Sequence, residues 1–497
     1  LSLTTEDEKL IASVGAKLLK KTRGERAPQR ILNCLLAAAT QPFEAGLKRE
    51  REEFMACLAD PQSAALRHMF FAERAAGKID SLPKDTKALD VASVGIIGAG
   101  TMGGGIAMCF AQAGIKVTLV DMTDEAVKLG LEKIAKNYAI SVKRGRLTAD
   151  QTDAIMANMT TSSNFNDLAH VDMVIEAVFE NLEVKKDVFA KLDGICKPGA
   201  VLASNTSYQS IDAIAAATTR PESVLGMHFF SPANVMKLLE VVKGAASSDT
   251  VIATAMAVGK KIGKVSVLSG MCYGFIGNRM LRHYGREASL CLIEGSTPSQ
   301  IDSAMESWGM AMGPLAVSDL AGLDIGYKAR EQLSAEQKGD PASYRVADRL
   351  VEAGRLGQKS GAGYYQYDPE TRQRQEDPAV MAIVTEARRE LGITPRQFDD
   401  EEIVKRLTLA LANEGTKLLQ EGIAQRASDI DVVYCYGYGF PRFKGGPMHT
   451  IESMGLDKAV TLINEFRDQL NPEHWQTAPL LTNLVANGGQ LADFHRD

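Results

Sequence analysis

A histidine and a glutamate stand out because of their apolar surroundings. His228 follows the run Val224–Met227, and Glu240 lies twelve residues later inside the run Leu238–Val242. A carboxylate in the middle of a strand would cost on the order of several kcal/mol if it stayed unpaired, and His228 is the obvious partner. Because histidine titrates near neutrality, the pair suits acid/base chemistry. A core ion pair, or an edge strand with Glu240 in solvent, explains the same pattern.

A second candidate site is the glycine-rich stretch that begins at Gly98. The apolar run Val94–Ile97 precedes it, a helical pattern follows to Gly114, and a β-rich run, Lys116–Val120, comes next. This order predicts strand, tight turn, helix and strand. It is the arrangement of a dinucleotide-binding unit, although glycines in loops also form purely structural turns.

Each glycine of this turn has a separate task. Gly98 permits the tight turn, Gly100 lets the backbone approach a pyrophosphate, and Gly103 lets the helix pack close to the strand. Thr101 and Met102 open the helix, whose N-terminal N–H groups would face the phosphates.

Asp121 indicates which dinucleotide this unit prefers. It ends the second strand, where a carboxylate can accept hydrogen bonds from the adenine ribose and would repel a 2′-phosphate. Met122 and Thr123 follow, so no basic residue is there to receive that phosphate. The sequence therefore favours NAD over NADP.

Apolar runs and helical patterns alternate from Val91 to about Ser269, which predicts a parallel, doubly wound sheet. Asp172–Val178 and Ala200–Ser204 have the composition of buried strands. Polar residues follow both runs, on the sheet edge where such folds bind ligands. These residues are Glu180, Asn205, Thr206 and Ser207.

Composition narrows the classes of protein. At 497 residues the chain should form two to four domains. Its net charge is −6 and both signs are dispersed, so the sequence does not indicate a surface that binds nucleic acid. The sequence contains no run of 18 apolar residues, which is the length that a membrane-spanning helix needs. The seven cysteines lack metal-ligand spacing, so we expect free thiols and no metal site. The chain opens on Leu1, as a fragment would, and ends without a Ser-Lys-Leu peroxisomal address, so we expect a cytoplasmic location.

The first residues, 1 to about 77, read as helices without an intervening strand. Thr5 is a plausible helix start, Asp60-Pro61 is typical of an N-cap followed by proline, and Gly77 is a plausible stop. The polar, proline-interrupted segment Ser81–Lys87 predicts a linker.

After Ser269 the pattern becomes helical and repeats, which predicts a duplicated helical unit. Five dipeptides recur in one order, at an offset that grows from 127 to 133 through insertions. The first copy has Glu287-Ala288, Glu294-Gly295, Ile301-Asp302, Gly313-Pro314 and Leu323-Asp324. The second has Glu414-Gly415, Glu421-Gly422, Ile430-Asp431, Gly446-Pro447 and Leu456-Asp457. At the opening offset Arg279 matches Arg406, but Asn278 falls on Lys405.

Several motifs resemble the L-3-hydroxyacyl-CoA dehydrogenase family, in the form carried by multifunctional enzymes of fatty-acid β-oxidation. They include GAGTMGGGIA from Gly98, HFFSPANVMKLLEVV from His228, GFIGNR from Gly274 and GQKSGAGYYQY from Gly357. The resemblance spans about residues 91 to 460. It implies a Rossmann-type sheet over 91–270 and an all-α domain of two repeats, 271–378 and 379–497. Residues 1–90 resemble the tail and linker of a hydratase (crotonase-fold) domain whose core this sequence does not contain, so we expect no hydratase activity.

The resemblance also implies roles for individual residues. His228 becomes the acid/base and Glu240 its partner, Ser207 and Asn278 lie beside the reacting oxygen, and NAD is the cofactor. Residues near the nicotinamide side would be Glu180, Lys185 and Asn205. Basic residues that could hold the CoA 3′-phosphate are Lys133, Lys136, Lys143 and Arg144, although each also fits a solvated basic face.

Other interpretations remain open. Sugar-nucleotide dehydrogenases use a cysteine nucleophile, and Cys272 lies near the domain junction, but its context GMCYGF lacks the glycine-rich, Pro-Lys-Asp surroundings expected there. The chain could instead be an NAD- or CoA-binding scaffold, or a docking subunit for a thiolase partner. Because single-repeat relatives form dimers through this helical domain, the resemblance implies that the duplicated copies pack as an internal pseudo-dimer and that the chain is a monomer.

Overall fold

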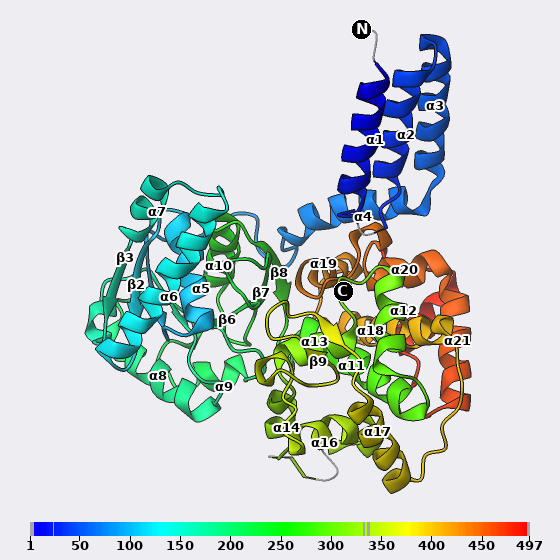
Figure 1. Ribbon diagram of the computed structural model, residues 1–497. Coiled ribbons are helices and arrows are strands. Elements are labelled where there is room, and N and C mark those ends of the chain that lie inside the picture. Colours follow the sequence, from blue (N-terminus) through cyan, green and yellow to red (C-terminus); the bar gives the residue numbers. More distant parts are fainter. Residues whose placement is uncertain (1–3, 23, 332, 335–337, 495–497) are drawn as a thin grey trace. The chain divides into compact units, whose positions relative to one another are not determined.

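Figure 1 shows a computed structural model of the chain, which describes residues 4–22, 24–331, 333–334 and 338–494. The chain divides into two compact units. The first comprises Leu1–Phe70, Met280–Thr416 and Gly439–Leu491, and the second Phe71–Arg279, Lys417–Tyr438 and Ala492–Asp497. The four-part division expected from the sequence stays a prediction.

The second unit is built on an eight-stranded sheet with the order β3-β2-β1-β4-β5-β6-β7-β8. The strands are β1 (Ser93–Ile97), β2 (Lys116–Val120), β3 (Met159–Ser162), β4 (Met173–Glu176), β5 (Val201–Ser204), β6 (Val224–Phe229), β7 (Leu238–Val242) and β8 (Val265–Ser269). Neighbours are parallel except β6 and β7, which are antiparallel. The expected parallel sheet therefore holds from β3 to β6, while β7 and β8 run the opposite way. Only eight residues join β6 to β7, and so short a connection can only join antiparallel neighbours.

Helices cover both faces of this sheet (Figure 1). On one face α5 (Thr101–Gln112) and α10 (Asp249–Lys261) pack on buried side chains such as Ile96, Leu119 and Met227. On the other face α8 (Leu182–Ile195) and α9 (Ile211–Ala215) pack on side chains that include Val174 and Leu202. The sheet is thus doubly wound, as the alternating sequence pattern predicts. Two further helices, α6 (Asp124–Lys143) and α7 (Ala149–Met156), connect β2 to β3.

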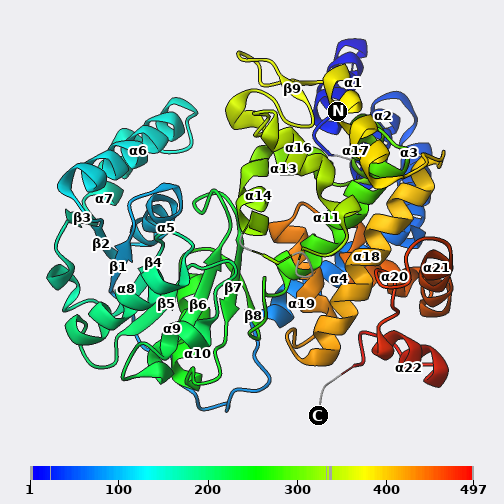
Figure 2. The ribbon, with the colours of Figure 1, turned by 90° about the horizontal axis from the view of Figure 1, so that it is seen from below.

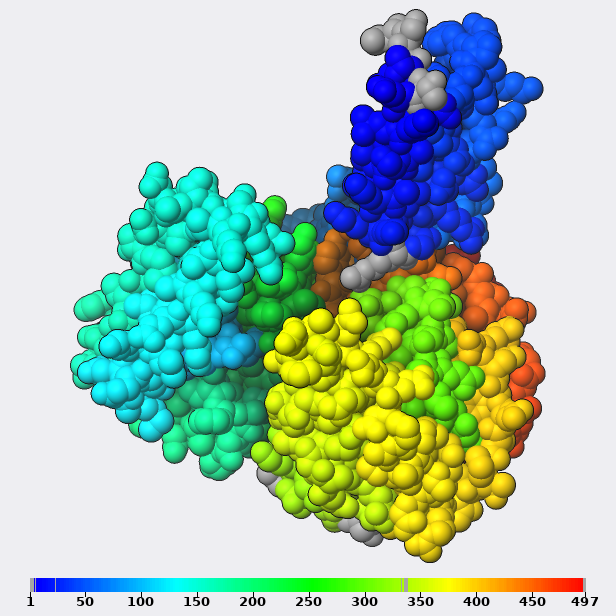
Figure 3. All heavy atoms as spheres, viewed as in Figure 1, coloured from blue at the N-terminus to red at the C-terminus, as the bar shows by residue number. Residues whose placement is uncertain are grey.

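The chain begins with α1 (Thr5–Leu19), α2 (Ala27–Thr40), α3 (Phe43–Ala59) and α4 (Pro61–Ala76). The first three pack side by side and form the blue column in Figure 3. Thr4 and Asp7 form a capping box at the start of α1, and the Gln62 amide donates to Asp60 at the start of α4. Both predicted helix starts are confirmed, and α4 ends one residue before Gly77.

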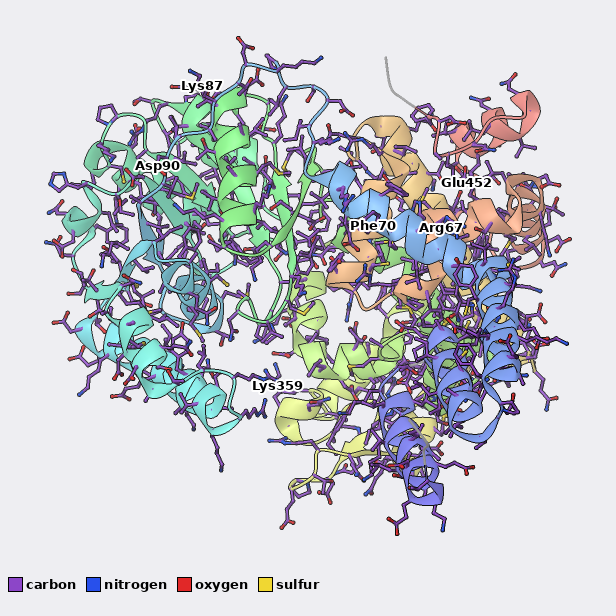
Figure 4. The ribbon with its side chains drawn as sticks, turned by 90° about the horizontal axis from the view of Figure 1, so that it is seen from above. Arg67, Phe70, Lys87, Asp90, Lys359 and Glu452 are labelled. Carbon is purple, nitrogen blue, oxygen red and sulfur yellow. The ribbon has the colours of Figure 1, made fainter. Side chains whose placement is uncertain are left out.

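An extended segment leads from α4 into the sheet, where Lys87 and Asp90 are labelled in Figure 4. It contains neither helix nor strand from residue 77 to residue 92, and its task as a linker stays a prediction. Among the residues described, no helix is long and apolar enough to cross a membrane.

The duplicated sequence pattern becomes a duplicated order of helices, which Figure 2 shows from below. The first copy contains α11 (Gly277–Glu294), α12 (Pro298–Trp308), α13 (Pro314–Ala321) and α14 (Leu323–Glu331). The second contains α18 (Asp400–Glu421), α19 (Ala427–Gly437), α20 (Pro447–Met454) and α21 (Leu456–Gln469), followed by α22 (Pro479–Asn487). Each repeated dipeptide falls at the same place in both copies. Glu294 and Glu421, for example, each end the first helix.

Equivalent arginines of the two copies make reciprocal ion pairs. Arg279 of the first copy lies 2.6 Å from Glu421 of the second. Arg406 of the second lies 2.6 Å from Glu294 of the first. Since Arg279 matches Arg406 and Glu294 matches Glu421, the same contact occurs twice with the copies exchanged, which is the signature of a two-fold interface. The internal pseudo-dimer stays a prediction.

Between the copies, the chain forms α16 (Arg345–Glu352), the hairpin β9 (Gln366–Tyr367) and β10 (Arg374–Gln375), and α17 (Pro378–Leu391). The motif GQKSGAGYYQY wraps around the buried carboxylate of Asp319. The amides of Tyr364 and Tyr365 and the Tyr367 hydroxyl donate to that carboxylate at 2.9 to 3.1 Å. This motif therefore has a structural task within the helical domain.

Candidate active site

His228 and Glu240 lie opposite each other on the antiparallel strands β6 and β7. His228 Nδ1 is 2.7 Å from Glu240 Oε2, and both side chains are buried, at 4% and 0% exposure. The reversal of β7 makes this direct cross-strand pair possible. Because an ionised carboxylate only accepts hydrogen bonds, Nδ1 carries a proton and donates it. Nε2 makes no hydrogen bond to the residues the structure describes, so it is available to a ligand.

The start of α11 holds the other oxygen of this carboxylate. The amide of Gly277 donates to Glu240 Oε1 at 3.0 Å, so both oxygens of the buried acid have partners. The next residue is Asn278, whose side-chain oxygen accepts a hydrogen bond from the Tyr438 hydroxyl at 2.8 Å. The predicted residues His228, Glu240 and Asn278 are therefore connected through the backbone of one helix start.

The polar residues after β5 form a second arm of the site. Glu180 Oε1 accepts hydrogen bonds from the Thr206 hydroxyl at 2.5 Å and from the amides of Ser207 and Tyr208 at 2.9 and 3.0 Å. This carboxylate fixes the loop that carries Ser207. The Ser207 hydroxyl itself makes no hydrogen bond to the described part of the chain.

Asn205, at the end of the same strand, ties the two arms together. Its side-chain oxygen accepts from the Phe229 amide at 2.8 Å, directly after His228. The loop after β5 and the histidine strand β6 therefore keep a fixed separation.

Lys185 has a structural environment that the sequence did not indicate. Its side chain is 1% exposed, and its amine lies 2.8 Å from Glu176 and 3.3 Å from Glu180. Glu176 also accepts from the Ser204 hydroxyl at 2.6 Å. A buried lysine needs such partners, and here it holds Glu180 in position over the loop.

The glycine turn has the geometry that close backbone packing requires. Gly98 has φ +101°, and a Cβ there would lie 2.6 Å from the Ala177 carbonyl oxygen. A Cβ on Gly103 would collide with the Gly98 carbonyl. The helix therefore packs against this turn at a distance that a larger residue at position 103 would not allow.

The start of α5 fits a pyrophosphate. Gly100 is its N-cap residue, no side chain caps the helix, and a Cβ at Gly100 would meet nothing within 4 Å. Backbone N–H groups are thus left without a side-chain cap, as an anion site requires. Asp121 lies beside this turn, since its carboxylate accepts from the Ala99 amide at 2.7 Å. Each of its oxygens keeps lone-pair capacity for a ribose hydroxyl.

Other sequence candidates take less central positions. Burial raises the pKa of the Cys272 thiol, which donates to the Phe275 carbonyl at 3.3 Å. A reactive cysteine needs a lowered thiol pKa, so Cys272 does not have the environment of a nucleophile. All seven cysteines are free, as predicted. The basic residues considered for the CoA 3′-phosphate are exposed at or just after the C-terminal part of α6: Lys133, Lys136, Lys143 and Arg144.

Sequence reasoning missed the aromatic side chains around His228 and Asn278. The rings of Phe230 and Phe275 lie 4.5 and 5.7 Å from the His228 ring, and Phe230 also contacts Tyr438 at 5.4 Å. Tyr438 belongs to the tyrosine-rich run YCYGYGF of the second copy. This run is the sequence feature that could have indicated aromatic side chains near the site.

A doubly wound sheet with an open glycine turn, beside a buried histidine–carboxylate pair, defines a nucleotide-dependent dehydrogenase. Comparison with known families agrees. The family described as "3-hydroxyacyl-CoA dehydrogenase, NAD binding domain" matches residues 93–272. The family described as "3-hydroxyacyl-CoA dehydrogenase, C-terminal domain" matches residues 274–367 and 403–491, one segment in each helical copy. The chain belongs to the 3-hydroxyacyl-CoA dehydrogenase family and is an oxidoreductase.

Similar proteins include multifunctional ones. The peroxisomal bifunctional enzyme of Danio rerio is 42% identical over 94% of this chain and 67% of its own length. The fatty acid oxidation complex subunit alpha of Shewanella amazonensis is 34% identical over 95% of this chain and 66% of its own length. This chain thus spans about two thirds of either relative.

Two solved structures resemble the chain closely. The dehydrogenase part of multifunctional enzyme 1 from C. elegans has a TM-score of 0.62 and 31% identity, over 84% of this chain and 96% of the other. The 3-hydroxybutyryl-CoA dehydrogenase of Escherichia coli has a TM-score of 0.68 and 28% identity, over 80% of this chain and 100% of the other. These likenesses support the family assignment.

Proposed function

We propose that the chain oxidises (S)-3-hydroxyacyl-CoA to 3-ketoacyl-CoA with NAD, with His228 as the acid/base. The observation that carries the proposal is the buried His228–Glu240 pair, 2.7 Å apart, whose outer nitrogen is left for a ligand. Buried histidine–carboxylate pairs of this kind are typical of sites for proton transfer, which supports an enzyme over a scaffold.

The reaction removes two hydrogens from the secondary alcohol. NAD supplies the acceptor for the hydride that leaves C3. The hydroxyl proton goes to Nε2 of His228, because Nδ1 already donates to Glu240. The Glu240 carboxylate then stabilises the imidazolium that forms. In the reverse direction the same nitrogen returns the proton to the alkoxide.

The oxygen of the substrate gains and loses negative charge during this step. We assign the Ser207 hydroxyl and the Asn278 amide as donors to that oxygen. In support of this assignment, Glu180 fixes the loop that carries Ser207, and Gly277 ties the helix that carries Asn278 to Glu240. Donors that are held in place need no reorganisation when the charge develops.

We propose NAD rather than NADP as the cofactor. The open helix start at Gly100 would bind the pyrophosphate, and Asp121 would accept from the adenine ribose. We assign Glu180, Lys185 and Asn205 to the nicotinamide side. Glu180 and Asn205 follow β4 and β5, and Lys185 lies near the start of α8. The Lys185–Glu180 ion pair and the hydrogen bond from the Phe229 amide to Asn205 would keep that side rigid.

The assembly and location are further proposals. We propose a monomer, because the reciprocal pairs of Arg279 and Arg406 give one chain both halves of a two-fold interface. Light scattering at micromolar concentration should report one chain mass. A stable species of twice that mass, dissociated by substitutions in the helical copies, would contradict this. Docking to a thiolase and a cytoplasmic location stay predictions.

The test of the function is a spectrophotometric series with NADH and 3-ketoacyl-CoA substrates, from acetoacetyl-CoA to longer chains. We expect loss of NADH absorbance that depends on both reactants, with little activity when NADPH replaces NADH. The same chain with His228→Gln serves as the blank. No activity above that blank with any chain length would refute the proposal.

A further inference from the structure

The second helical copy contributes a tyrosine to the site that the first copy carries. Tyr438 follows the end of α19, and its hydroxyl lies 2.8 Å from the side-chain oxygen of Asn278. The Tyr438 ring contacts Phe230, which in turn lies 4.5 Å from the His228 ring. Tyr438 is therefore one side chain away from both groups that the proposed reaction uses.

A side-chain amide can be presented to a ligand in two ways. It has an oxygen that accepts and a nitrogen that donates, and a half-turn exchanges them. The proposed reaction needs the nitrogen, because the substrate oxygen carries negative charge. An amide turned the other way would place its own oxygen against that charge and repel it.

The Tyr438 hydroxyl selects one of the two amide orientations, because it donates to the side-chain oxygen of Asn278. Burial, reinforced by the charge of Glu240, raises the pKa of Tyr438 well above its usual value, so the hydroxyl keeps its proton. With that proton on Asn278 Oδ1, the oxygen is occupied and the nitrogen faces the remaining direction. Asn278 Nδ2 makes no hydrogen bond to the residues described, so it is free for the substrate.

A second tyrosine fixes the backbone of the same helix start. Tyr434 lies one turn before Tyr438 on the same part of the chain, and the two rings stack with centroids 4.8 Å apart. The Tyr434 hydroxyl donates to the Gly277 carbonyl at 3.0 Å, while the Gly277 amide donates to Glu240. A Cβ on Gly277 would collide with the Tyr438 ring, so the absent side chain leaves room for this contact.

The two copies differ at the positions that meet here. At the offset of 129 set by Ile301 and Ile430, the places of Tyr434 and Tyr438 correspond to Met305 and Gly309 in the first copy. Asn278 in turn corresponds to Lys405 in the second copy. The tyrosine and the amide therefore each occur once, on opposite copies, and they form one hydrogen bond.

We propose that Tyr438 is a positioning residue of the dehydrogenase, which orients the Asn278 amide so that its nitrogen donates to the substrate oxygen. The proposal rests on the function proposed above, because it needs Asn278 to act on that oxygen. It gives the second copy a direct part in the site, beyond covering a surface of the first.

The test is a double-mutant cycle with acetoacetyl-CoA and NADH. Tyr438→Phe keeps the ring and removes the hydroxyl, and should lower kcat roughly tenfold, the value of one lost hydrogen bond. Asn278→Ala should lower kcat by about 10² or more. The double variant should be no slower than Asn278→Ala alone, because the hydroxyl acts only through the amide. KM for NADH should not change in any of the three.

A matched control separates positioning from a general loss of structure. Tyr344→Phe alters a tyrosine whose ring packs against Arg330, and should keep wild-type kcat. The melting temperature of Tyr438→Phe should stay within a few degrees of the wild type, since one hydroxyl is removed.

The outcomes distinguish the two proposals. Wild-type turnover in Asn278→Ala would remove the donor role of Asn278 and, with it, the task of Tyr438. An impaired Asn278→Ala beside an unimpaired Tyr438→Phe would overturn only the inference about Tyr438. Losses that multiply in the double variant would also overturn it, because they would show that the hydroxyl acts independently of the amide.

Discussion

The sheet and the helical copies each bury a paired glutamate, but the partners of the two carboxylates differ. In the sheet, Glu240 pairs with His228 at 2.7 Å. Between the helical copies, Arg406 is 0% exposed and pairs with Glu287 at 3.0 Å and Glu294 at 2.6 Å. A histidine can release its proton near neutrality, whereas an arginine cannot. The partner of the carboxylate therefore decides whether a buried pair serves proton transfer or holds helices together.

The carboxylates around Arg406 keep its guanidinium charged although it is buried. Burial disfavours the charge of Arg406, but Cys291, Glu294 and Glu287 outweigh it and raise the pKa of the guanidinium above its usual value. Such a pair contributes a fixed geometry and no exchangeable proton. If this contrast is correct, substitutions in the two pairs should affect different measurements.

The largest effect is expected at His228. His228→Gln should lose 10² to 10⁴ in turnover, the usual contribution of general acid/base catalysis, because glutamine cannot accept the substrate proton. Its amide can still donate to Glu240, so the melting temperature and NADH binding should stay near those of the wild type. Glu240→Gln should be impaired through a misoriented or less basic histidine. Near wild-type turnover in His228→Gln would remove the assignment.

The next largest effect is expected at Arg406, in stability rather than in turnover. Arg406→Met removes the buried cation that pairs with Glu287 and Glu294 and leaves Glu287 with Arg286 alone, at 3.1 Å. This loss should cost about 3 kcal/mol in the free energy of unfolding, the lower end for a broken buried pair. The equivalent residue of the first copy is the control. Arg279 and Glu421 have side chains 22% and 47% exposed, so Arg279→Met should cost about 1 kcal/mol or less. Equal losses in urea unfolding of the two variants would show that burial does not set the cost.

Asp302 sharpens the comparison, because its closest partners are uncharged. The amides of Leu315 and Ala316 and the Tyr365 hydroxyl donate to it, while Arg374 is 3.8 Å away. Burial raises the pKa of Asp302 to about 6 from 3.8. The folded state thus holds the proton more tightly, so the stabilisation is complete below about pH 4 and is lost as the pH rises through 6.

The size of this effect is on the order of 3 kcal/mol, from a shift of about two pKa units. Asp302→Asn cannot titrate, so its free energy of unfolding should vary less between pH 4 and 7 than that of the wild type. Asp429, whose pKa burial also raises to about 6, stays in both proteins and gives the residual slope. Parallel pH profiles for the two proteins would contradict the assignment to Asp302.

The smallest effect is expected at Asp121, a partly exposed carboxylate that would exclude a 2′-phosphate by repulsion. Like charges about 4 Å apart near water repel by about 1 kcal/mol per unit charge, so Asp121→Ser should narrow the preference for NADH over NADPH by roughly tenfold. The ratio of kcat/KM for the two cofactors measures it. Equal use of both cofactors by the wild-type chain would show that Asp121 does not discriminate.

Local sequence signals predicted much of this molecule. The starts of α1 and α4, the glycine turn and the repeated order of helices follow from capping, backbone freedom and periodicity, which act over a few residues. The pairing of His228 with Glu240 followed from the cost of an unpaired buried charge, which is a local argument about two strands.

Contacts between distant segments were out of reach. The hydrogen bond between Tyr438 and Asn278 joins residues 160 apart, and no local pattern specifies such a pair. The buried bridge of Lys185 to Glu176 was equally hidden, since a lysine in a helical pattern usually faces solvent. The reversal of β7 could have been read from the short connection after β6, had that length been weighed.

The reciprocal contacts of Arg279 and Arg406 have a consequence for how this protein can change. In an assembly of two identical chains, every substitution appears twice and must be tolerated at both places. Two tandem copies in one chain escape this, since each position is encoded separately. Lys405 can then replace the amide on one copy while Tyr438 arises where the other has Gly309. The tandem arrangement keeps the framework of a symmetric pair and lets selection act on each half alone.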